Sequence, residues 1–135
     1  MCFYTVLTKP SPAAPANSVL TAAITAKLRG AGKVLLIEKS ELYGGTSALS
    51  GGGVWIPNNR YAKAAGAQDS VAEARDYLRH TIPAGDVPEH LLDVYLQRAP
   101  EMLDLLHNHT CVRYESLDHY PDYYSDKPGA KAGHR

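Results

Sequence analysis

The chain has 135 residues, which is enough for one domain of ordinary size with a hydrophobic core. Its 14 basic and 14 acidic residues balance, so no net charge favours nucleic acid or an anionic membrane as a partner. No apolar run is long enough to span a bilayer, and the isolated Cys2 and Cys111 indicate neither a zinc site nor a disulfide framework. We therefore expect a soluble cytoplasmic protein without a metal site.

The first part of the chain predicts a strand, a helix and a second strand. Aromatic and β-branched residues favour a short strand at 3–8, and a connector rich in proline and alanine follows. The next stretch is typical of a helix that Ser18 caps and that Gly30 or Gly32 ends. The run VLLIE at 34–38 is typical of a strand buried on both faces of a parallel sheet. A helix followed closely by such a strand indicates a βαβ unit and an α/β fold.

The second part of the chain predicts helices separated by prolines. After the extended VWIPNN at 54–59, Ser70 and Glu73 have the spacing of a capping box at the start of a helix. Pro88 begins a further helix, and Pro100 lies where another helix would place its first residue. Two short helices are therefore expected here rather than one long helix.

The C-terminal part combines a strand-like stretch with a loop. TCVRYESL has the composition of a strand, and HYPDYYSDKPGAKAGHR is rich in turn residues. This loop ends the chain without a closing helix or strand. We therefore expect the chain to be an interrupted piece of a larger fold.

The segment from Glu38 onward is the part most suited to bind a nucleotide. An acidic residue at the end of the second strand of a dinucleotide-binding fold accepts hydrogen bonds from ribose hydroxyls, although a lone glutamate there is also common as a solvated residue. The glycines of this segment allow a ligand to come close and expose backbone N–H groups, and its threonine and serines supply hydroxyl donors. The candidate residues are Gly44, Gly45, Thr46, Ser47, Ser50, Gly51, Gly52 and Gly53. The alternative is that this segment is a flexible linker, but the TSALS sequence between the two glycine clusters argues against it.

VLLIEKSELYGGTSALSGGGVWIPNN resembles the second flavin-contacting segment of the FAD-dependent fumarate reductase and 3-ketosteroid Δ1-dehydrogenase superfamily. SGGGVWIPNN and YPDYYSDKPGAKAGHR are most similar to the ketosteroid dehydrogenase branch, and the resemblance covers residues 20–135. It implies a fragment of a Rossmann-like FAD-binding domain at 1–60. A helical segment at 61–135 would then lead into the substrate or cap region and be truncated.

The resemblance also implies a cofactor, a reaction and roles for single residues. Glu38 would hold the adenosine ribose of FAD, Gly45 to Ser47 would line the pyrophosphate and ribityl chain, and Ser50 to Gly53 would lie near the flavin ring. In the reaction, a tyrosine base removes a proton beside a ketone and a hydride passes to flavin N5, which forms a double bond. The substrate would be a ketosteroid or a related unsaturated ketone or acid. The candidate bases are Tyr123, Tyr120 and Tyr124, in that order of preference; the alternative is that these tyrosines only pack or solvate a loop.

The chain departs from this family where a G-x-G-x-x-G turn should bind the pyrophosphate. The three glycines would fall at Ala14, Ala16 and Val19, and Pro15 removes a backbone donor between them. A shifted reading frame at the N-terminus would explain the alanines and prolines, and sequencing the gene across the first 20 codons tests this hypothesis. We expect residues 3–8 to serve as a substitute first strand.

Because the fingerprint and the later catalytic half are missing, we expect the chain to be inactive alone. A complementing chain could carry the rest of the enzyme. The alternatives are a non-catalytic remnant or a small nucleotide-binding module.

Overall fold

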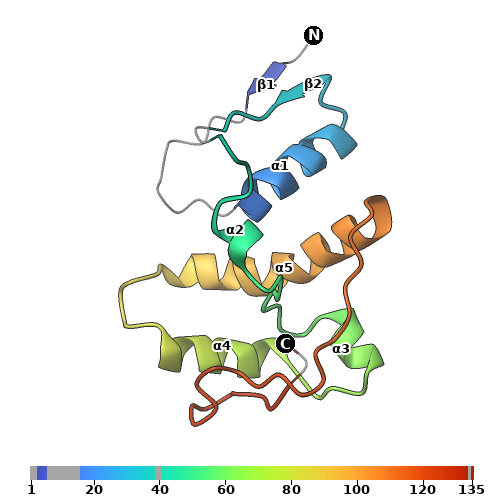
Figure 1. Cartoon of the computed structure of the whole chain (residues 1–135). Helices are drawn as coiled ribbons and strands as arrows, with labels where there is room; N and C mark the ends of the chain where they lie inside the picture. The colour runs from blue at the N-terminus through green and yellow to red at the C-terminus, as the bar shows by residue number, and fades with distance from the viewer. Residues whose placement is uncertain (1–2, 6–15, 39–40, 134) are drawn as a thin grey trace. The chain divides into compact units, whose positions relative to one another are not determined.

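A computed structural model describes residues 3–5, 16–38, 41–133 and 135. In chain order, these residues form the elements that Figure 1 labels: β1 (Phe3–Thr5), α1 (Ala16–Leu28), β2 (Lys33–Leu35), α2 (Gly45–Leu49), α3 (Arg60–Ala64), α4 (Val71–Thr81) and α5 (Glu89–His109). They divide into two compact units, unit 1 (Met1–Gly53) and unit 2 (Val54–Arg135). Within the described ranges, no helix combines the length and the apolar character needed to cross a membrane.

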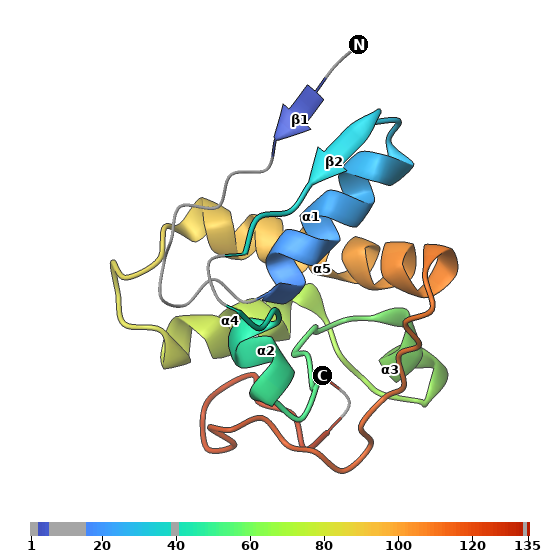
Figure 2. The ribbon, with the colours of Figure 1, turned by 45° about the horizontal axis from the view of Figure 1, so that its top comes forward.

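Unit 1 contains a pair of parallel strands with a helix between them in the chain. β1 pairs with β2 so that Tyr4 lies opposite Val34, and α1 packs beside β2 (Figure 2). The expected substitute first strand is therefore confirmed for residues 3–5; the rest of that stretch lies outside the described residues. Strand, helix and parallel strand follow one another as in a βαβ unit.

The ends of α1 follow local chain chemistry. The helix ends in a Schellman motif at Gly30 (φ 89°), where the N–H groups of Gly30 and Ala31 donate to carbonyl oxygens of the last turn at 3.1 and 3.0 Å. This confirms the predicted stop. The predicted N-cap was wrong, because the helix begins at Ala16 and places Ser18 inside its first turn. Alanine has a high helix propensity and extends the helix toward the N-terminus.

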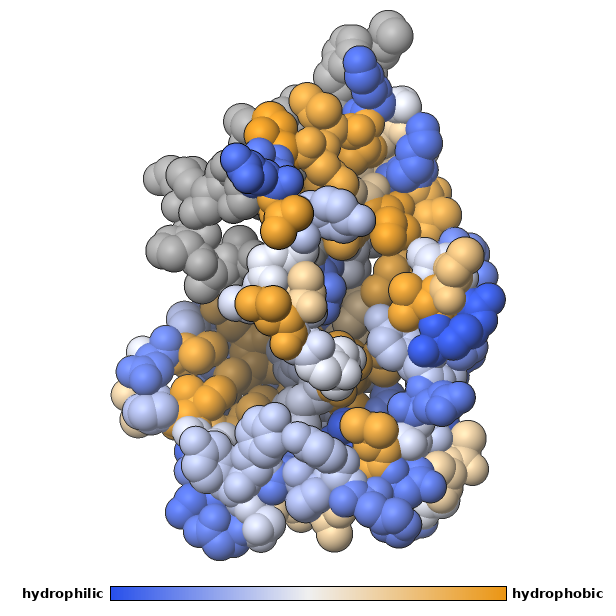
Figure 3. All heavy atoms as spheres, viewed as in Figure 1, coloured by the Kyte–Doolittle hydropathy of each residue, from blue (hydrophilic) through white to orange (hydrophobic). Residues whose placement is uncertain are grey.

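The expectation of a long, doubly buried strand at 34–38 was also wrong. β2 ends at Leu35, and exposed fractions of 52, 44 and 58% are found for Leu35, Leu36 and Ile37. A parallel strand is buried only when strands flank both edges and helices cover both faces. In the described part of the chain, β1 is the single strand beside β2, so these side chains remain on the surface. Figure 3 shows hydrophobic residues gathered over the β2 region.

Unit 2 is built around α5, which packs against α4. One face of α5 is buried, at spacings of three and four residues typical of an amphipathic helix: Leu92, Leu96, Ala99, Leu103 and Leu106. Ala99 and Leu103 pack with Ile56 from the segment that enters the unit, and Tyr61, Met102 and Tyr114 surround this contact. The hydrophobic core of unit 2 therefore lies along one face of α5.

Two predictions for unit 2 were wrong. Residues 89–109 form one helix that contains Pro100, because the apolar face continues through the proline and the packing offsets the lost backbone hydrogen bond. TCVRYESL forms no strand. Instead, Arg113 Nη1 donates to the carbonyl oxygens of His107, Thr110 and Val112 at 2.7–2.9 Å, which holds the chain against the end of α5.

Side chains cap the N-termini of α3 and α4. Ser70 Oγ accepts from the Glu73 N–H at 3.2 Å and donates to a Glu73 carboxylate oxygen at 3.0 Å, which confirms the predicted cap of α4. The short helix α3 was not predicted. It begins after Asn59, whose Oδ1 accepts from the Ala62 N–H at 2.9 Å.

Candidate functional site

The predicted nucleotide-binding residues all lie in unit 1. Glu38 follows β2 by three residues and is exposed. Gly44 (φ 117°) and Gly45 (φ 52°) both have positive φ at the start of α2, a conformation that suits glycine. A Cβ on Gly44 would lie 2.6 Å from the Ala48 Cβ, so the turn excludes any side chain there.

The hydroxyl residues Thr46, Ser47 and Ser50 stand in α2 or at its end. Ser50 Oγ donates to the Ser47 carbonyl at 3.1 Å and accepts from the Gly52 N–H at 3.2 Å. The Ser50 hydroxyl therefore shapes the backbone that leads into the second glycine cluster. This local role was not predicted, and it is compatible with contact to a ligand because the residue is exposed.

The second glycine cluster is open. Gly51, Gly52 and Gly53 are exposed, and a Cβ built on any of them would meet no atom of the described chain within 4 Å. Only Gly52, with φ 81°, needs glycine for its backbone conformation. Packing within the described residues therefore does not explain why Gly51 and Gly53 lack side chains, whereas close approach of a bound group would.

The segment after β2 in unit 1 fits a flavin nucleotide, whereas the first strand-to-helix connection does not. The acid after β2 and the open glycine cluster suit a ribose and a flat ring. The first strand-to-helix connection does not suit a pyrophosphate, because no glycine occurs before Gly30. Ala16 and Val19 lie within α1, and Ala14 is outside the described residues.

The candidate catalytic tyrosines lie in unit 2, in the stretch 117–133, which we call the tyrosine loop. Their exposed fractions are 55% for Tyr120, 84% for Tyr123 and 55% for Tyr124. The Tyr120 and Tyr123 hydroxyl oxygens are 3.4 Å apart and the rings meet edge to face. The hydrogen bond with Tyr123 raises the pKa of Tyr120 above its ordinary value.

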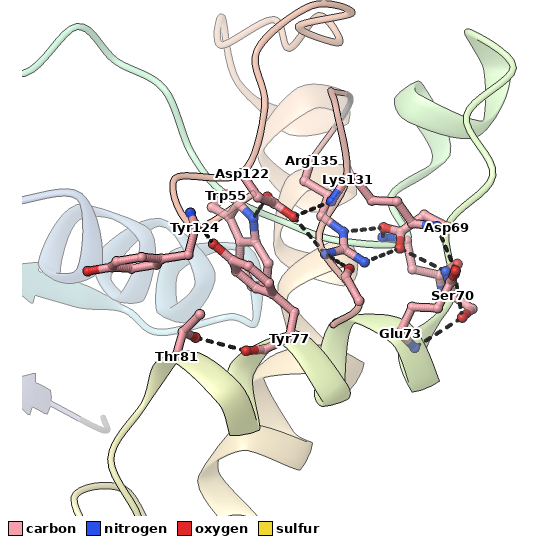
Figure 4. Close-up of polar contacts among 12 residues, drawn as sticks. Trp55, Asp69, Ser70, Glu73, Tyr77, Thr81, Asp122, Tyr124, Lys131 and Arg135 are labelled. Atoms are coloured by element: carbon pink, nitrogen blue, oxygen red, sulfur yellow. Dashed lines mark hydrogen bonds and ion pairs between the residues drawn. The ribbon is translucent and has the colours of Figure 1, made fainter. Parts of the chain in front are cut away.

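A buried cluster around Arg135 was not predicted (Figure 4). The Arg135 guanidinium donates to both oxygens of Asp69, from Nη2 at 2.6 Å and Nε at 3.1 Å, and to Asp122 Oδ2 from Nη1 at 2.9 Å. These three side chains are only 2–3% exposed. The guanidinium also lies 5.6 Å from the Trp55 ring centroid and 5.8 Å from that of Tyr77. We call these five residues the Arg135 cluster.

Asp69 is held as a carboxylate by the donors around it. Besides Arg135, the N–H groups of Asn58 and Ser70 donate to it at 2.7 and 2.8 Å. Burial pushes the pKa of Asp69 upward, but the hydrogen bonds from Arg135 and Asn58 outweigh it and leave the pKa below its usual value. Burial likewise opposes the charge of Arg135, but the hydrogen bond and the charge of Asp69 keep its pKa raised.

Two glycines bring the tyrosine loop to this cluster. A Cβ on Gly129 (φ 76°) would overlap the Glu73 carbonyl of α4, and a Cβ on Gly133 would overlap the Asp118 carbonyl. The only feature of the sequence that could have indicated this contact is the spacing of these glycines ahead of Arg135 in PGAKAGHR. That spacing indicates close backbone approach, but it does not identify the two carboxylates.

The chain belongs to the family described as the FAD binding domain, which matches residues 19–133. FAD is therefore the cofactor that this family membership indicates, as the sequence predicted. Among the described residues, no group of three or more His, Cys, Asp or Glu side chains is placed to hold a metal ion.

Particular dehydrogenases are similar to most of this chain. A 3-oxosteroid 1-dehydrogenase of Mycolicibacterium smegmatis is 45% identical over 83% of this chain, and a 4-oxocyclohexanecarboxylate 2-dehydrogenase of Sinomonas cyclohexanicum is 42% identical over 86%. The crystal structure of 3-ketosteroid Δ1-dehydrogenase from Sterolibacterium denitrificans, in complex with 1,4-androstadiene-3,17-dione, superposes with a TM-score of 0.76 at 43% identity over 90% of this chain. These relatives confirm the predicted resemblance. The chain spans only 19–21% of their lengths.

Proposed function

We propose that this chain supplies part of the FAD site and one catalytic segment of a dehydrogenase of the 3-ketosteroid Δ1-dehydrogenase type. The observation that supports this most is the sequence identity of 42–45% to enzymes whose names each describe dehydrogenation of an oxo-substituted ring compound. A ketosteroid or a related cyclic ketone is the proposed substrate. The cytoplasm is the proposed location, as the isolated cysteines suggest.

The proposed cofactor site uses the carboxylate and the glycine clusters of unit 1. Glu38 accepts hydrogen bonds from the adenosine ribose, and Gly45 to Ser47 lie along the pyrophosphate and ribityl chain. Ser50 and the open glycines up to Gly53 leave room for the flavin ring. The strand–helix–strand order of unit 1 is the start of the proposed Rossmann-like domain at 1–60. Bound FAD supplies the hydride acceptor of the reaction.

The proposed base is Tyr123, with Tyr120 as its partner. The Tyr120 hydroxyl is protonated at neutral pH, as an ordinary phenol is, so it can donate to the Tyr123 oxygen 3.4 Å away. A donated hydrogen bond favours negative charge on the acceptor, which helps Tyr123 to remove a proton beside the substrate ketone. Residues 61–135 are then the segment that carries this pair toward the substrate region.

We further propose that this chain is inactive alone and works with a complementing chain. The relatives that it matches are more than four times its length, and its first connection lacks the phosphate-binding glycines. A remnant without catalysis and a small nucleotide-binding module are the alternatives.

Retention of FAD by the purified chain tests the cofactor site. The chain is incubated with FAD and desalted, and the flavin absorbance that remains bound is measured. We expect retained flavin, less retained flavin in Glu38→Gln, and no change in the exposed control Glu41→Gln. A colourless protein that FAD does not stabilise would support the remnant, and one that FAD stabilises would support the nucleotide-binding module.

Reconstitution tests the complementing chain. The chain is mixed with the part of the Mycolicibacterium smegmatis enzyme that lies outside the matched region, and steroid dehydrogenation is followed with an artificial electron acceptor. We expect activity in the mixture and none in either part. Turnover by the 135-residue chain alone would contradict the proposed inactivity.

A further inference from the structure

Asp122 closes the base of the tyrosine loop. Its backbone N–H donates to the Lys131 carbonyl at 2.9 Å, and its Oδ2 accepts from the Lys131 N–H at 2.9 Å. Asp122 lies between Tyr120 and Tyr123 in the sequence, so this closure restrains the backbone on both sides of the proposed catalytic pair. The neighbouring Tyr124 N–H donates to the Tyr77 hydroxyl of α4 at 3.2 Å.

The other oxygen of Asp122 holds the segment that follows the glycine cluster. Asp122 Oδ1 accepts from Trp55 Nε1 at 2.6 Å, and Trp55 follows Gly53 by two residues. The Trp55 carbonyl accepts from the Tyr95 hydroxyl of α5, and the two rings are stacked 6.3 Å apart. One buried carboxylate therefore connects the tyrosine loop to the start of unit 2.

Arg135 sets the orientation of this carboxylate. Two acidic side chains share the one guanidinium, and each is also bound by N–H donors, so the buried charges are paired and hydrogen-bonded. Apolar residues of similar volume often stabilise a core as well as a buried ion pair does. The ion pairs differ from apolar packing in that they fix the orientation of the carboxylates, because a planar guanidinium bonds carboxylates in defined geometries.

We infer that Asp122, oriented by Arg135, is a positioning residue that holds Tyr120 and Tyr123 together as a hydroxyl pair. The catalytic role of the Tyr120 and Tyr123 pair in this inference rests on the proposed function. The pairing itself is a property of the folded chain and is measured without FAD or steroid. A failure to bind FAD would therefore not be confused with a failure of this inference.

The test follows the two phenols by NMR in the full chain carrying tyrosine labelled with ¹³C at Cζ, with Tyr120→Phe and Tyr123→Phe to assign the signals. Asp122→Asn and Arg135→Lys are compared with Asp126→Asn, a control on the same loop whose carboxylate lies on the surface. In both cluster variants we expect the Tyr120 pKa to fall toward its ordinary value, because the pair separates. The control should titrate like the wild type.

Circular dichroism and the emission of Trp55, the one tryptophan of the chain, report whether each variant is folded. Folded variants with shifted Trp55 emission but wild-type titration of both tyrosines would overturn the inference and leave the cluster a structural role only. If Asp122→Asn does not fold, Arg135→Lys, which keeps the charge but loses the planar geometry, decides between the two outcomes.

Discussion

Single residues without side chains determine how closely the tyrosine loop approaches α4. Gly129 combines a φ of 76° with a position where a Cβ would overlap the Glu73 carbonyl and lie 2.9 Å from the Tyr77 nitrogen. Gly85 has a similar φ of 91° but open space around it. The two positions therefore separate the effect of backbone conformation from the effect of packing.

Gly129→Ala should lower the free energy of unfolding by about 2–4 kcal/mol, because the strain of positive φ and a backbone clash act together. Gly85→Ala should lower it by only about 1 kcal/mol, since conformation alone is affected. Urea unfolding followed by Trp55 fluorescence measures both values. Equal losses in the two variants would contradict the close packing of the loop on α4.

Asp69 makes stability depend on pH in a definite direction. Its pKa is lower in the folded chain than in the unfolded chain, where it is about 3.9, so its stabilisation is complete above that pH and is lost as the pH falls through the folded value. At neutral pH, Asp69→Asn should lower the free energy of unfolding by about 1–3 kcal/mol. The difference between wild type and variant should shrink below about pH 4 in urea unfolding experiments. A difference that stays constant with pH would show that the charge of Asp69 is not responsible.

At the scale of elements, the helices of unit 2 depend on caps and on continuous apolar faces. α4 begins where the Ser70 hydroxyl satisfies the Glu73 N–H, a property of four neighbouring residues. α5 continues through Pro100 because the buried residues on either side, Leu96 and Leu103, pack on the same face. Local chemistry thus determines one helix start, and packing overrides a local signal to stop.

Ser70→Ala should reduce the free energy of unfolding by about 0.5–2 kcal/mol, because the N–H of Glu73 loses its acceptor. Ser125→Ala on the exposed part of the tyrosine loop is the matched control and should change it by less than about 0.5 kcal/mol. Thermal unfolding followed by circular dichroism compares the two. If Ser70→Ala left the free energy of unfolding unchanged, water would cap the helix as well as the serine hydroxyl does.

At the scale of the whole molecule, burial is concentrated in unit 2. Among the residues whose burial is described, the buried hydrophobic residues of unit 1 are Ala23 and Ala31, whereas the larger ones all lie in unit 2. Unit 1 leaves Leu35, Leu36 and Ile37 largely exposed. Since buried apolar area is the main stabilising contribution, the stability of the chain should come mostly from unit 2.

Leu96→Ala should therefore lower the free energy of unfolding by about 2–5 kcal/mol, because it opens a cavity on the buried face of α5. Ile37→Thr, in the run that the sequence presented as core, should change it by less than about 0.5 kcal/mol. Urea unfolding followed by circular dichroism tests both variants. A large loss in Ile37→Thr would show that this side chain is buried in solution.

The family and its cofactor could be predicted from the sequence, because the residue types and spacing of the segment after β2 are local features of the chain. Glu38 and the glycine clusters remain the proposed cofactor-binding residues. The Arg135 cluster could not be predicted, since its partners are 66 residues apart for Asp69 and 80 for Trp55 (135 − 55). Which of many acidic residues meets a given arginine depends on the fold.

The sequence by itself determined the family, the cofactor, the end of α1 and the cap of α4, because each depends on residues close together in the chain. Only the tertiary structure decided that Leu35, Leu36 and Ile37 are exposed, that α5 continues through Pro100 and that Asp122 joins the tyrosine loop to Trp55. The physical reason is that burial and charge pairing depend on which surfaces meet, and hydrophobic periodicity alone does not specify the partner.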